Sequence, residues 1–222
     1  MSSQTLYRWS GIVLLVGSLL GVIGSILDTL LIPGNSETAQ QVLSTPFTID
    51  ASLFLAWALL LTMGLPGLYL RQATRAGALG FAGFVLLSLG LLLGGVAFAI
   101  VQVTIFPYLA QSAPKLLPSG GTGPTTGFLL WILVPGLLLA IGDILLGIAT
   151  MRAHVFPRWA GILLIVAGVL LLLAFAPIPF ISLASNVVFF VAFAWCGYTL
   201  VAQRKETAMA PSLATPAAQT GR

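Results

Sequence analysis

Six long apolar stretches, separated by short segments richer in polar residues, follow one another along the 222 residues of the chain. A helix that crosses a bilayer needs about 20 predominantly apolar residues, and most of the stretches reach that length. The pattern predicts an all-α fold, a polytopic transmembrane helical bundle that forms one domain over residues 1–202. The six expected helices lie near residues 9–32, 50–70, 77–105, 127–150, 159–176 and 180–202.

The segments between these stretches predict loops and a tail. Residues 33–49 and 106–126 contain Pro, Gly, Ser and Thr, which favour turns and irregular backbone. Within the first loop, Ala39 and Val42 have the spacing of a short helix on the surface. Residues 203–222 are rich in Ala, Thr and Pro and show no hydrophobic period, so we expect a disordered cytoplasmic tail.

The first and fifth expected helices begin with nearly the same sequence. Arg8-Trp9-Ser10-Gly11-Ile12 is repeated as Arg158-Trp159-Ala160-Gly161-Ile162. An Arg followed by a Trp suits the membrane interface, because the guanidinium reaches water and phosphate while the indole lies at headgroup level. We expect the six helices to form three hairpins. The repeat leaves two interpretations open: tandem parallel repeats, or a chance likeness between apolar helices.

The composition agrees with a membrane location and argues against nucleic-acid binding. Hydrophobic residues make up 59% of the chain and charged residues only 6%, whereas a soluble domain carries about 25% charged residues. The net charge of +4 comes from basic residues that stand singly or in pairs between apolar stretches. The lipid bilayer is therefore the expected partner. A membrane-protein partner or a homo-oligomer stays open, and no nucleic acid is expected.

Basic residues fall almost entirely on one side of a six-pass chain. Lys115 is the exception, and the eight other basic residues lie on the opposite side. Such an excess marks the cytoplasmic side of a membrane protein, so both termini are expected in the cytoplasm. The eight residues are Arg8, Arg71, Arg75, Arg152, Arg158, Arg204, Lys205 and Arg222.

Two acids interrupt apolar helices at the same offset from small residues. Asp28 follows Ser25 by three positions, and Asp143 follows Ala140 by three. Residues three or four apart share a helix face, and rows of small residues let helix backbones approach closely. Both acids should therefore point into the bundle rather than toward lipid.

Asp143 lies deeper in the expected bilayer than Asp28. An unpaired charge at that depth is costly, so the carboxyl needs a neutralising or hydrogen-bonding environment. The Thr62 hydroxyl and the Trp195 indole N–H come to about the same level of the bundle and are suitable donors. We expect Asp143 to be buried between helices and bonded to one of them. A functional role and a purely structural role both stay open.

Polar residues also gather at the outer ends of the expected helices, on the side opposite most basic residues. A cleft that opens there could bind a small polar or cationic ligand, and the plainer interpretation is that helix ends are simply hydrated. The candidate polar site consists of Asp28, Asp50, Gln102 and Asn186, with Asp143 at greater depth.

The sequence offers no catalytic, cofactor or metal motif. His154 is the only histidine and Cys196 the only cysteine, which excludes bis-histidine haem ligation and CxxC redox chemistry. No Gly-x-Ser-x-Gly, P-loop or His-Glu-x-x-His pattern occurs. We therefore expect no metal, no cofactor and no enzymatic activity.

Two patterns carry a resemblance to a known group of proteins. The Arg-Trp-Ser/Ala-Gly-Ile helix openings and the segment Gly67-Leu68-Tyr69-Leu70-Arg71-Gln72 resemble a family of bacterial six-helix, multi-pass membrane proteins of unknown function. The resemblance covers nearly the whole chain except the tail. It implies a bacterial cytoplasmic (inner) membrane location, and it implies no activity or site residue.

Two functions fit these observations. The first is a non-enzymatic helical scaffold or interaction subunit, which fits the near absence of charge within the helices. The second is a small-solute transporter or permeability protein that uses the outer polar cluster and Asp143. A continuous polar channel from Asp28 to Asp143 would favour transport, whereas a dry core of leucine and glycine would favour the scaffold.

Overall fold

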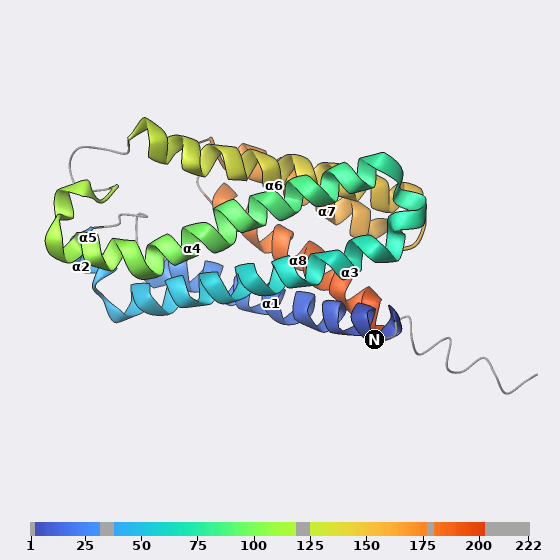
Figure 1. The fold of residues 1–222 in the computed structure, drawn as a ribbon, viewed down its shortest axis with the longest axis horizontal. Helices are drawn as coiled ribbons and strands as arrows, with labels where there is room; N and C mark the ends of the chain where they lie inside the picture. The colour runs from blue at the N-terminus through green and yellow to red at the C-terminus, as the bar shows by residue number, and fades with distance from the viewer. Residues whose placement is uncertain (1–2, 32–37, 119–124, 177–179, 203–222) are drawn as a thin grey trace, which may run out of the picture.

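The computed structural model describes residues 3–31, 38–118, 125–176 and 180–202, and nearly all of them are helical (Figure 1). Within these ranges there is no β-strand, so the predicted all-α fold is confirmed. The expected tail, residues 203–222, lies outside the described residues. The long helices are α1 (Ser3–Leu31), α3 (Thr45–Gly90), α6 (Thr126–Ala153), α7 (Arg158–Leu173) and α8 (Ile181–Ala202).

A single glycine reverses the direction of the longest helix. At Gly77 in α3, φ is 61° and ψ is −163°, a backbone conformation that is strained for any residue with a Cβ. The chain runs along the bundle in a first arm, residues 45–76, and returns in a second arm, residues 78–112 (Figure 1). The two arms lie side by side, because Tyr69 stacks on Phe84 with ring centroids 4.7 Å apart.

The second arm changes its helical geometry as it returns. After Gly90 it continues as the π-helix η2 (Leu91–Ala97), α4 (Phe98–Ile100), the π-helix η3 (Val101–Ile105) and α5 (Phe106–Ser112). Short π-helical segments are rare and recur at functional sites. The loop predicted from residue 106 is therefore wrong as far as Ser112, because these residues are helical. Pro107 does not break the helix because it stands in the first turn of α5.

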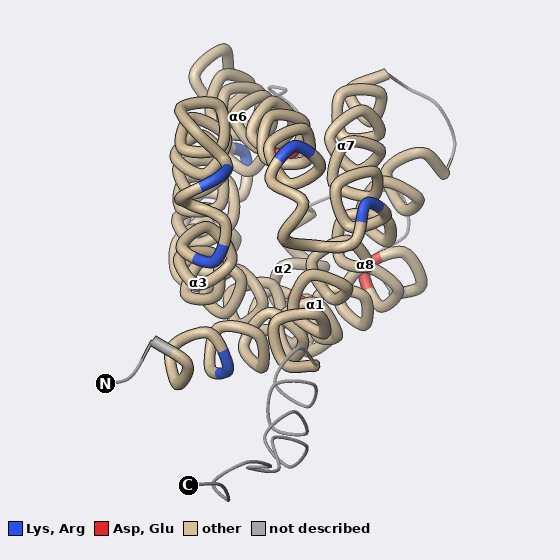
Figure 2. The backbone as a smooth tube through the Cα atoms, turned by 90° about the vertical axis from the view of Figure 1, so that its right-hand side faces the viewer, with Lys and Arg blue, Asp and Glu red and all other residues tan. Residues whose placement is uncertain are grey.

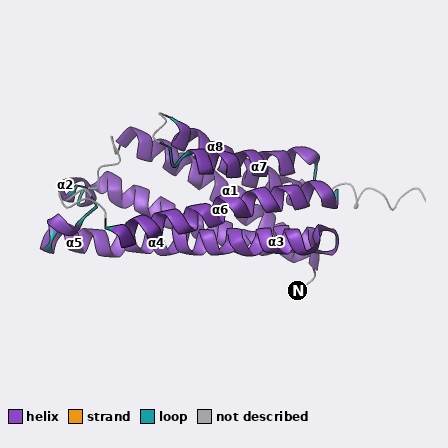
Figure 3. Cartoon of the chain, turned by 90° about the horizontal axis from the view of Figure 1, so that it is seen from above, coloured by secondary structure: helices purple, strands orange, loops and turns teal. Residues whose placement is uncertain are grey.

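The helices form a closed ring in which α8 packs against α1. Following the ring, α1 packs on the first arm, the second arm on α6, α6 on α7 and α7 on α8. Figure 2 views the ring from the end where α1 begins and α8 ends, and most Lys and Arg residues gather there. The axes of the long helices are roughly aligned with one another (Figure 3).

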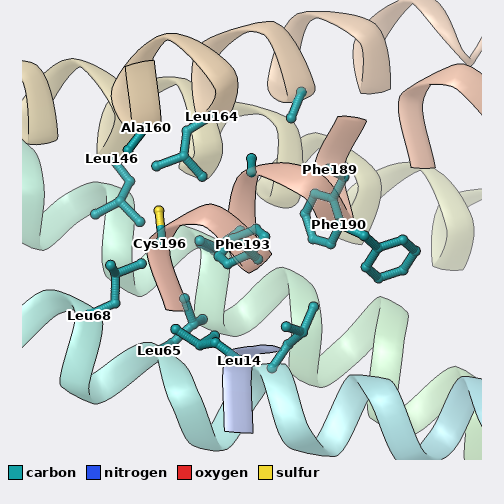
Figure 4. Packing of buried hydrophobic residues seen from close by; sticks show 14 of the residues in the cluster. Leu14, Leu65, Leu68, Leu146, Ala160, Leu164, Phe189, Phe190, Phe193 and Cys196 are labelled. Atoms are coloured by element: carbon teal, nitrogen blue, oxygen red, sulfur yellow. The ribbon is translucent and has the colours of Figure 1, made fainter. Parts of the chain in front are cut away.

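Leucine and phenylalanine side chains fill the interior of the ring (Figure 4). Five fully buried members come from five different helices: Leu14, Leu65, Leu146, Leu164 and Phe193. Large apolar side chains also cover the outer surface, where Leu19 is 62% and Met63 is 68% exposed. An apolar exterior of this kind is what a helical bundle presents to lipid.

Among the described residues, four helical stretches are long and apolar enough to cross a membrane: Gln4–Leu30, Thr45–Ser112, Thr126–Ala153 and Ile181–Ala202. The second of them contains both arms, since it includes the reversal at Gly77. The fifth expected helix is short, as the sequence indicated. It forms α7, whose 16 residues span about 24 Å at 1.5 Å per residue, less than a hydrocarbon core of about 30 Å.

Small residues set the distances between neighbouring helices, as predicted. A Cβ built on Gly17 would lie 2.9 Å from the Cβ of Leu60, and one built on Gly90 would lie 2.7 Å from the Cγ of Leu139. Real Cβ atoms do not approach other atoms this closely. The helix pairs can therefore adopt these distances only with glycine at the crossing.

A smaller apolar cluster covers the end of the bundle opposite the basic residues. The short helix predicted from the sequence forms α2 (Ala39–Val42) and packs against α5, and the 3-10 helix η4 (Pro114–Leu116) follows α5. This end is therefore ordered beyond the long helices. The buried members of the cluster are Val42, Phe47, Ala51, Phe106, Ala110 and Leu117.

Candidate functional site

Four of the five candidate polar residues line one pocket of about 280 Å³, which we call the acid pocket. Asp28 comes from α1, Asp50 from the first arm, Gln102 from η3 and Asn186 from α8. Each residue lies near the end of its helix that is remote from the basic residues. The four side chains meet because the ring brings these helix ends together.

Aromatic rings form much of the remaining wall of the acid pocket. Trp57 packs edge-on against Phe54 and Phe190, with centroid distances of 4.7 and 4.9 Å. Phe54 also packs edge-on against Phe98 at 6.1 Å. Sequence reasoning missed these rings, because they come from three separate parts of the chain and a single aromatic residue in an apolar helix carries no signal of a site.

The charged residues in the wall of the acid pocket are all acidic. Among the described residues that line it, two are acids and none is Lys or Arg. Both acids, Asp28 and Asp50, line this one pocket. Neither carboxyl makes a hydrogen bond or ion pair with a residue in the described part of the chain. A bound cation would therefore meet carboxyl groups that no described protein cation neutralises.

The inner end of the acid pocket is closed by the apolar core. Phe190 is only 3% exposed and lies so close to Gly21 of α1 that a Cβ there would overlap its ring. Phe190 belongs to the central cluster together with Leu14 and Phe193, and Figure 4 shows it at one edge of that cluster. Phe190 thus joins the wall of the acid pocket to the apolar core, and Asp143 is not among the residues that line the pocket.

Asp143 is fully buried on α6, close to Gly168 of α7. Its predicted burial between helices is confirmed, but the predicted hydrogen bond is wrong, because neither carboxyl oxygen has a partner among the described residues. The Thr62 hydroxyl donates instead to the carbonyl oxygen of Ala58 in its own helix, at 2.7 Å. Trp195 is 43% exposed.

Three further buried side chains have polar atoms without a partner in the described ranges: Ser18, Gln72 and Thr150. Thr150 follows Asp143 by two helical turns and therefore shares its face of α6. Buried polar groups of this kind are where ordered water binds inside proteins. No group of three or more His, Cys, Asp or Glu residues that could hold a metal occurs in the described residues.

A second pocket of about 340 Å³ lies beside the acid pocket, and we call it the apolar pocket. Phe98 lines both pockets. The apolar pocket lies between η3, α5 and the beginning of α6. Its wall is mainly hydrocarbon and includes Ile105, Phe106, Leu109, Leu116, Phe128 and Trp131.

Together these features suit the recognition of a compact organic cation. Carboxyl groups supply negative charge, aromatic faces attract a cation through their quadrupoles, and the amides of Gln102 and Asn186 can hydrogen-bond. Comparison of the chain with protein-family models, with curated proteins and with solved structures found no match. The assignment of a function therefore rests on the geometry of the two pockets.

Proposed function

We propose that the protein binds a small organic cation at the bacterial cytoplasmic membrane, as the recognition step of a small-solute transporter or permeability protein. The observation that carries this proposal is the acid pocket, in which Asp28 and Asp50 lie together inside an aromatic wall. The resemblance of the helix openings to bacterial multi-pass proteins supports the bacterial location. The acidic and amide residues of the pocket lie toward the helix ends remote from the basic residues, which is the outer side in the proposed orientation.

An organic cation fits the acid pocket better than a metal ion does. Ca²⁺ takes six to eight oxygen ligands, and Mg²⁺ requires a near-octahedral set of oxygens. The described wall offers four polar side chains from the candidate set and four aromatic rings, around a volume of about 280 Å³. Aromatic rings recognise alkylammonium groups, and each such contact contributes about 0.5–2 kcal/mol.

The closed core favours a second candidate, a non-enzymatic scaffold or interaction subunit. Asp143 does not line the acid pocket, and Phe190 in the wall of that pocket belongs to the apolar core. For transport, Phe190 would have to move away from Gly21. A scaffold needs no such motion, and it would bind no cation.

We further propose that the six helices are three tandem hairpins with both termini in the cytoplasm. Support comes from two equivalent glycine contacts, Gly11 with Gly197 and Gly161 with Gly147. Each joins the glycine of an Arg-Trp opening to a glycine near the basic end of a neighbouring helix. Gly77 begins the second proposed hairpin and makes no such contact with the described residues. The glycine contact is therefore shared by the first and third hairpins only.

The test of ligand binding uses the full chain in lipid nanodiscs, titrated calorimetrically with tetramethylammonium. We expect saturable binding that weakens by at least about tenfold, or 1.4 kcal/mol, when Asp28→Asn and Asp50→Asn are combined. Asp143→Asn is the matched control, because Asp143 is also an acid of the bundle but does not line the acid pocket. If the unaltered chain binds no tetramethylammonium, or if the double variant binds it equally well, cation recognition at this site is refuted.

A further inference from the structure

We propose that the basic end of the bundle binds an anionic phospholipid, whose phosphate is held by Arg71 and Arg75. In the proposed orientation this lipid belongs to the cytoplasmic leaflet. The site lies at the end of the bundle opposite the acid pocket, so it does not depend on cation binding there. The inference is carried by two exposed arginines one helical turn apart, of which Arg71 lies over the ring of Tyr7.

A tight crossing of α1 and the first arm brings Tyr7 and Arg71 together. A Cβ built on Gly67 would overlap the Ser10 side chain, and one built on Gly64 would lie 3.1 Å from the Ser10 carbonyl oxygen. Tyr7 lies about one turn from Ser10, and Arg71 about one turn from Gly67. Both steps lead toward the basic end, because α1 begins there and the first arm ends there. The two side chains therefore meet just beyond the crossing.

The ring of Tyr7 orients the guanidinium of Arg71. The guanidinium carbon lies 5.5 Å from the ring centroid, within the distance of about 6 Å over which a cation is attracted to an aromatic face. Arg75 follows Arg71 by four residues and shares its helix face. A planar guanidinium can donate two parallel hydrogen bonds to one phosphate. The first of the two arginines is thus held in place before a phosphate binds, which lowers the entropy lost on binding.

No acid of the described part of the chain balances the charge at this end. Asp28 and Asp50 line the acid pocket at the opposite end, and Asp143 is fully buried on α6. Like charges four residues apart on a helix repel each other, so an anion bound between Arg71 and Arg75 stabilises both. The exposed arginines of the basic end are Arg8, Arg71, Arg75, Arg152 and Arg158 (Figure 2).

The surface beside the two arginines suits the hydrocarbon chains of a lipid. Leu70 precedes Arg71 and is 47% exposed, and Met63, two turns earlier on the same helix face, is 68% exposed. On the neighbouring α1, Trp9 is 60% exposed, and Trp is enriched at the level of lipid headgroups. A phosphate at Arg71 therefore lies where the apolar exterior of the bundle begins. This arrangement matches a phospholipid, since a free anion would make no use of the apolar surface.

A headgroup with a net negative charge fits this end better than a zwitterionic headgroup. The ammonium group of a zwitterionic lipid would meet exposed arginines without a described carboxylate to pair with. Basic clusters at the ends of transmembrane helices attract anionic lipids, and each arginine near the surface contributes about fivefold in affinity. Arg71 and Arg75 together should therefore favour the anionic lipid by well over tenfold, on the order of 30-fold.

The experiment uses the full chain in phosphatidylcholine nanodiscs that contain a small fraction of phosphatidylglycerol with a photoreactive diazirine near its headgroup. We expect the label on peptides from the start of α1 and the end of the first arm. Arg71→Gln combined with Arg75→Gln should reduce it by about tenfold or more. Arg152→Gln combined with Arg158→Gln removes the same charge from the same end. This control should change the label by less than about twofold, because salt screens charges that do not touch the phosphate.

Three results would overturn the lipid site. Equal loss of label in the two double variants would mean that the whole basic end attracts lipid without a site at Arg71 and Arg75. Equal labelling by the same probe with a phosphatidylcholine headgroup would exclude recognition of an anionic lipid. Suppression of the label by excess inorganic phosphate, at constant ionic strength, would assign the arginines to a free anion.

Arg71→Lys tests the guanidinium itself and guards against a double variant that fails to fold. Lysine keeps the positive charge but lacks the planar fork and stacks less well on Tyr7, so the label should fall by about threefold or more. Full labelling of Arg71→Lys would show that charge alone attracts the lipid and would refute the phosphate clamp. Thermal unfolding of this variant should match that of the unaltered chain, because residue 71 is exposed.

Discussion

Gly147 of α6 and Gly161 of α7 pack backbone against backbone, and a Cβ built on either would lie 2.7 Å from the carbonyl oxygen of the other. Gly11 and Gly197 do the same between α1 and α8, at 2.9 and 2.8 Å. Carbonyl oxygens are backbone atoms and cannot move aside as a side chain can. These two crossings therefore depend on glycine more strictly than a contact between side chains would.

Replacing Gly161 by Val should separate α6 from α7. Overpacking of a tight contact typically costs about 1–3 kcal/mol, and we expect a loss of this size in the free energy of unfolding. Gly127→Val should change this free energy little, because a Cβ at Gly127 would meet only the Thr125 hydroxyl oxygen, at 4.0 Å. Unfolding in detergent micelles, followed by circular dichroism, measures both variants. Equal stability of the two would contradict the inferred helix contact.

Replacing Gly77 by Ala tests the reversal of α3. Nothing lies within 4 Å of a Cβ built at this position, so the cost comes from the backbone conformation alone, about 1–3 kcal/mol. Gly77→Asn should not rescue stability, because the observed ψ of −163° differs from the left-handed helical value of about +47° that Asn tolerates. Chemical denaturation would show the effect, and an unchanged midpoint for Gly77→Ala would rule out the strain.

Trp57 should contribute to cation affinity through its ring face. Trp57→Leu keeps an apolar side chain but removes the quadrupole, and loss of a desolvated cation–π contact costs about 2 kcal/mol, or roughly 30-fold in Kd. Trp195→Leu is the matched control, since Trp195 is 43% exposed and does not line the acid pocket. Titration with tetramethylammonium compares them. Equal loss in both variants would argue for a general effect on folding.

Asp143→Asn should leave both the free energy of unfolding and cation binding nearly unchanged. The substitution keeps the shape of the side chain, and Asp143 has no hydrogen-bond partner among the described residues that the change could strand. The measurements are denaturation in micelles and titration with tetramethylammonium. Loss of binding with intact stability would show that Asp143 acts together with the acid pocket, as a transport route through the bundle requires.

The orientation can be measured with single cysteines, since the native thiol of Cys196 is fully buried. Thr74 and Gln111 are both exposed and lie at opposite ends of the bundle. In intact cells, a membrane-impermeant maleimide should label Gln111→Cys and should spare Thr74→Cys until the membrane is permeabilised. The opposite pattern would reverse the proposed topology and place the acid pocket on the cytoplasmic side.

The polar residues of the acid pocket could be predicted from the sequence, because they all lie near the same end of the expected helices. Asp28 ends one apolar stretch and Asp50 begins the next, so any antiparallel arrangement places them at the same end. The aromatic wall could not be foreseen, because Trp57 and Phe190 meet only through the order of helices around the ring. Apolar periodicity does not encode that order.

The backbone irregularities were missed for a different reason. Gly77 is one of 24 glycines in the sequence, and a positive φ cannot be read from the residue type alone. The π-helix η2 contains only apolar residues and glycine, and η3 adds Gln102 and Thr104, so neither segment carries a residue pattern that distinguishes it from an α-helix. The partner expected for Asp143 was wrong because depth along the helices was known from the sequence, whereas the rotation of each helix about its own axis was not.

The contact between α1 and α8 has a consequence for how the chain is made. Of the described helices, α1 leaves the ribosome first and α8 last, and synthesis proceeds at about 5–20 residues per second. Until α8 is inserted, the face of α1 that contains Gly11 lacks the helix against which it packs in the finished bundle. The nascent protein must therefore keep this face of α1 uncovered by its own chain for many seconds before the ring can close.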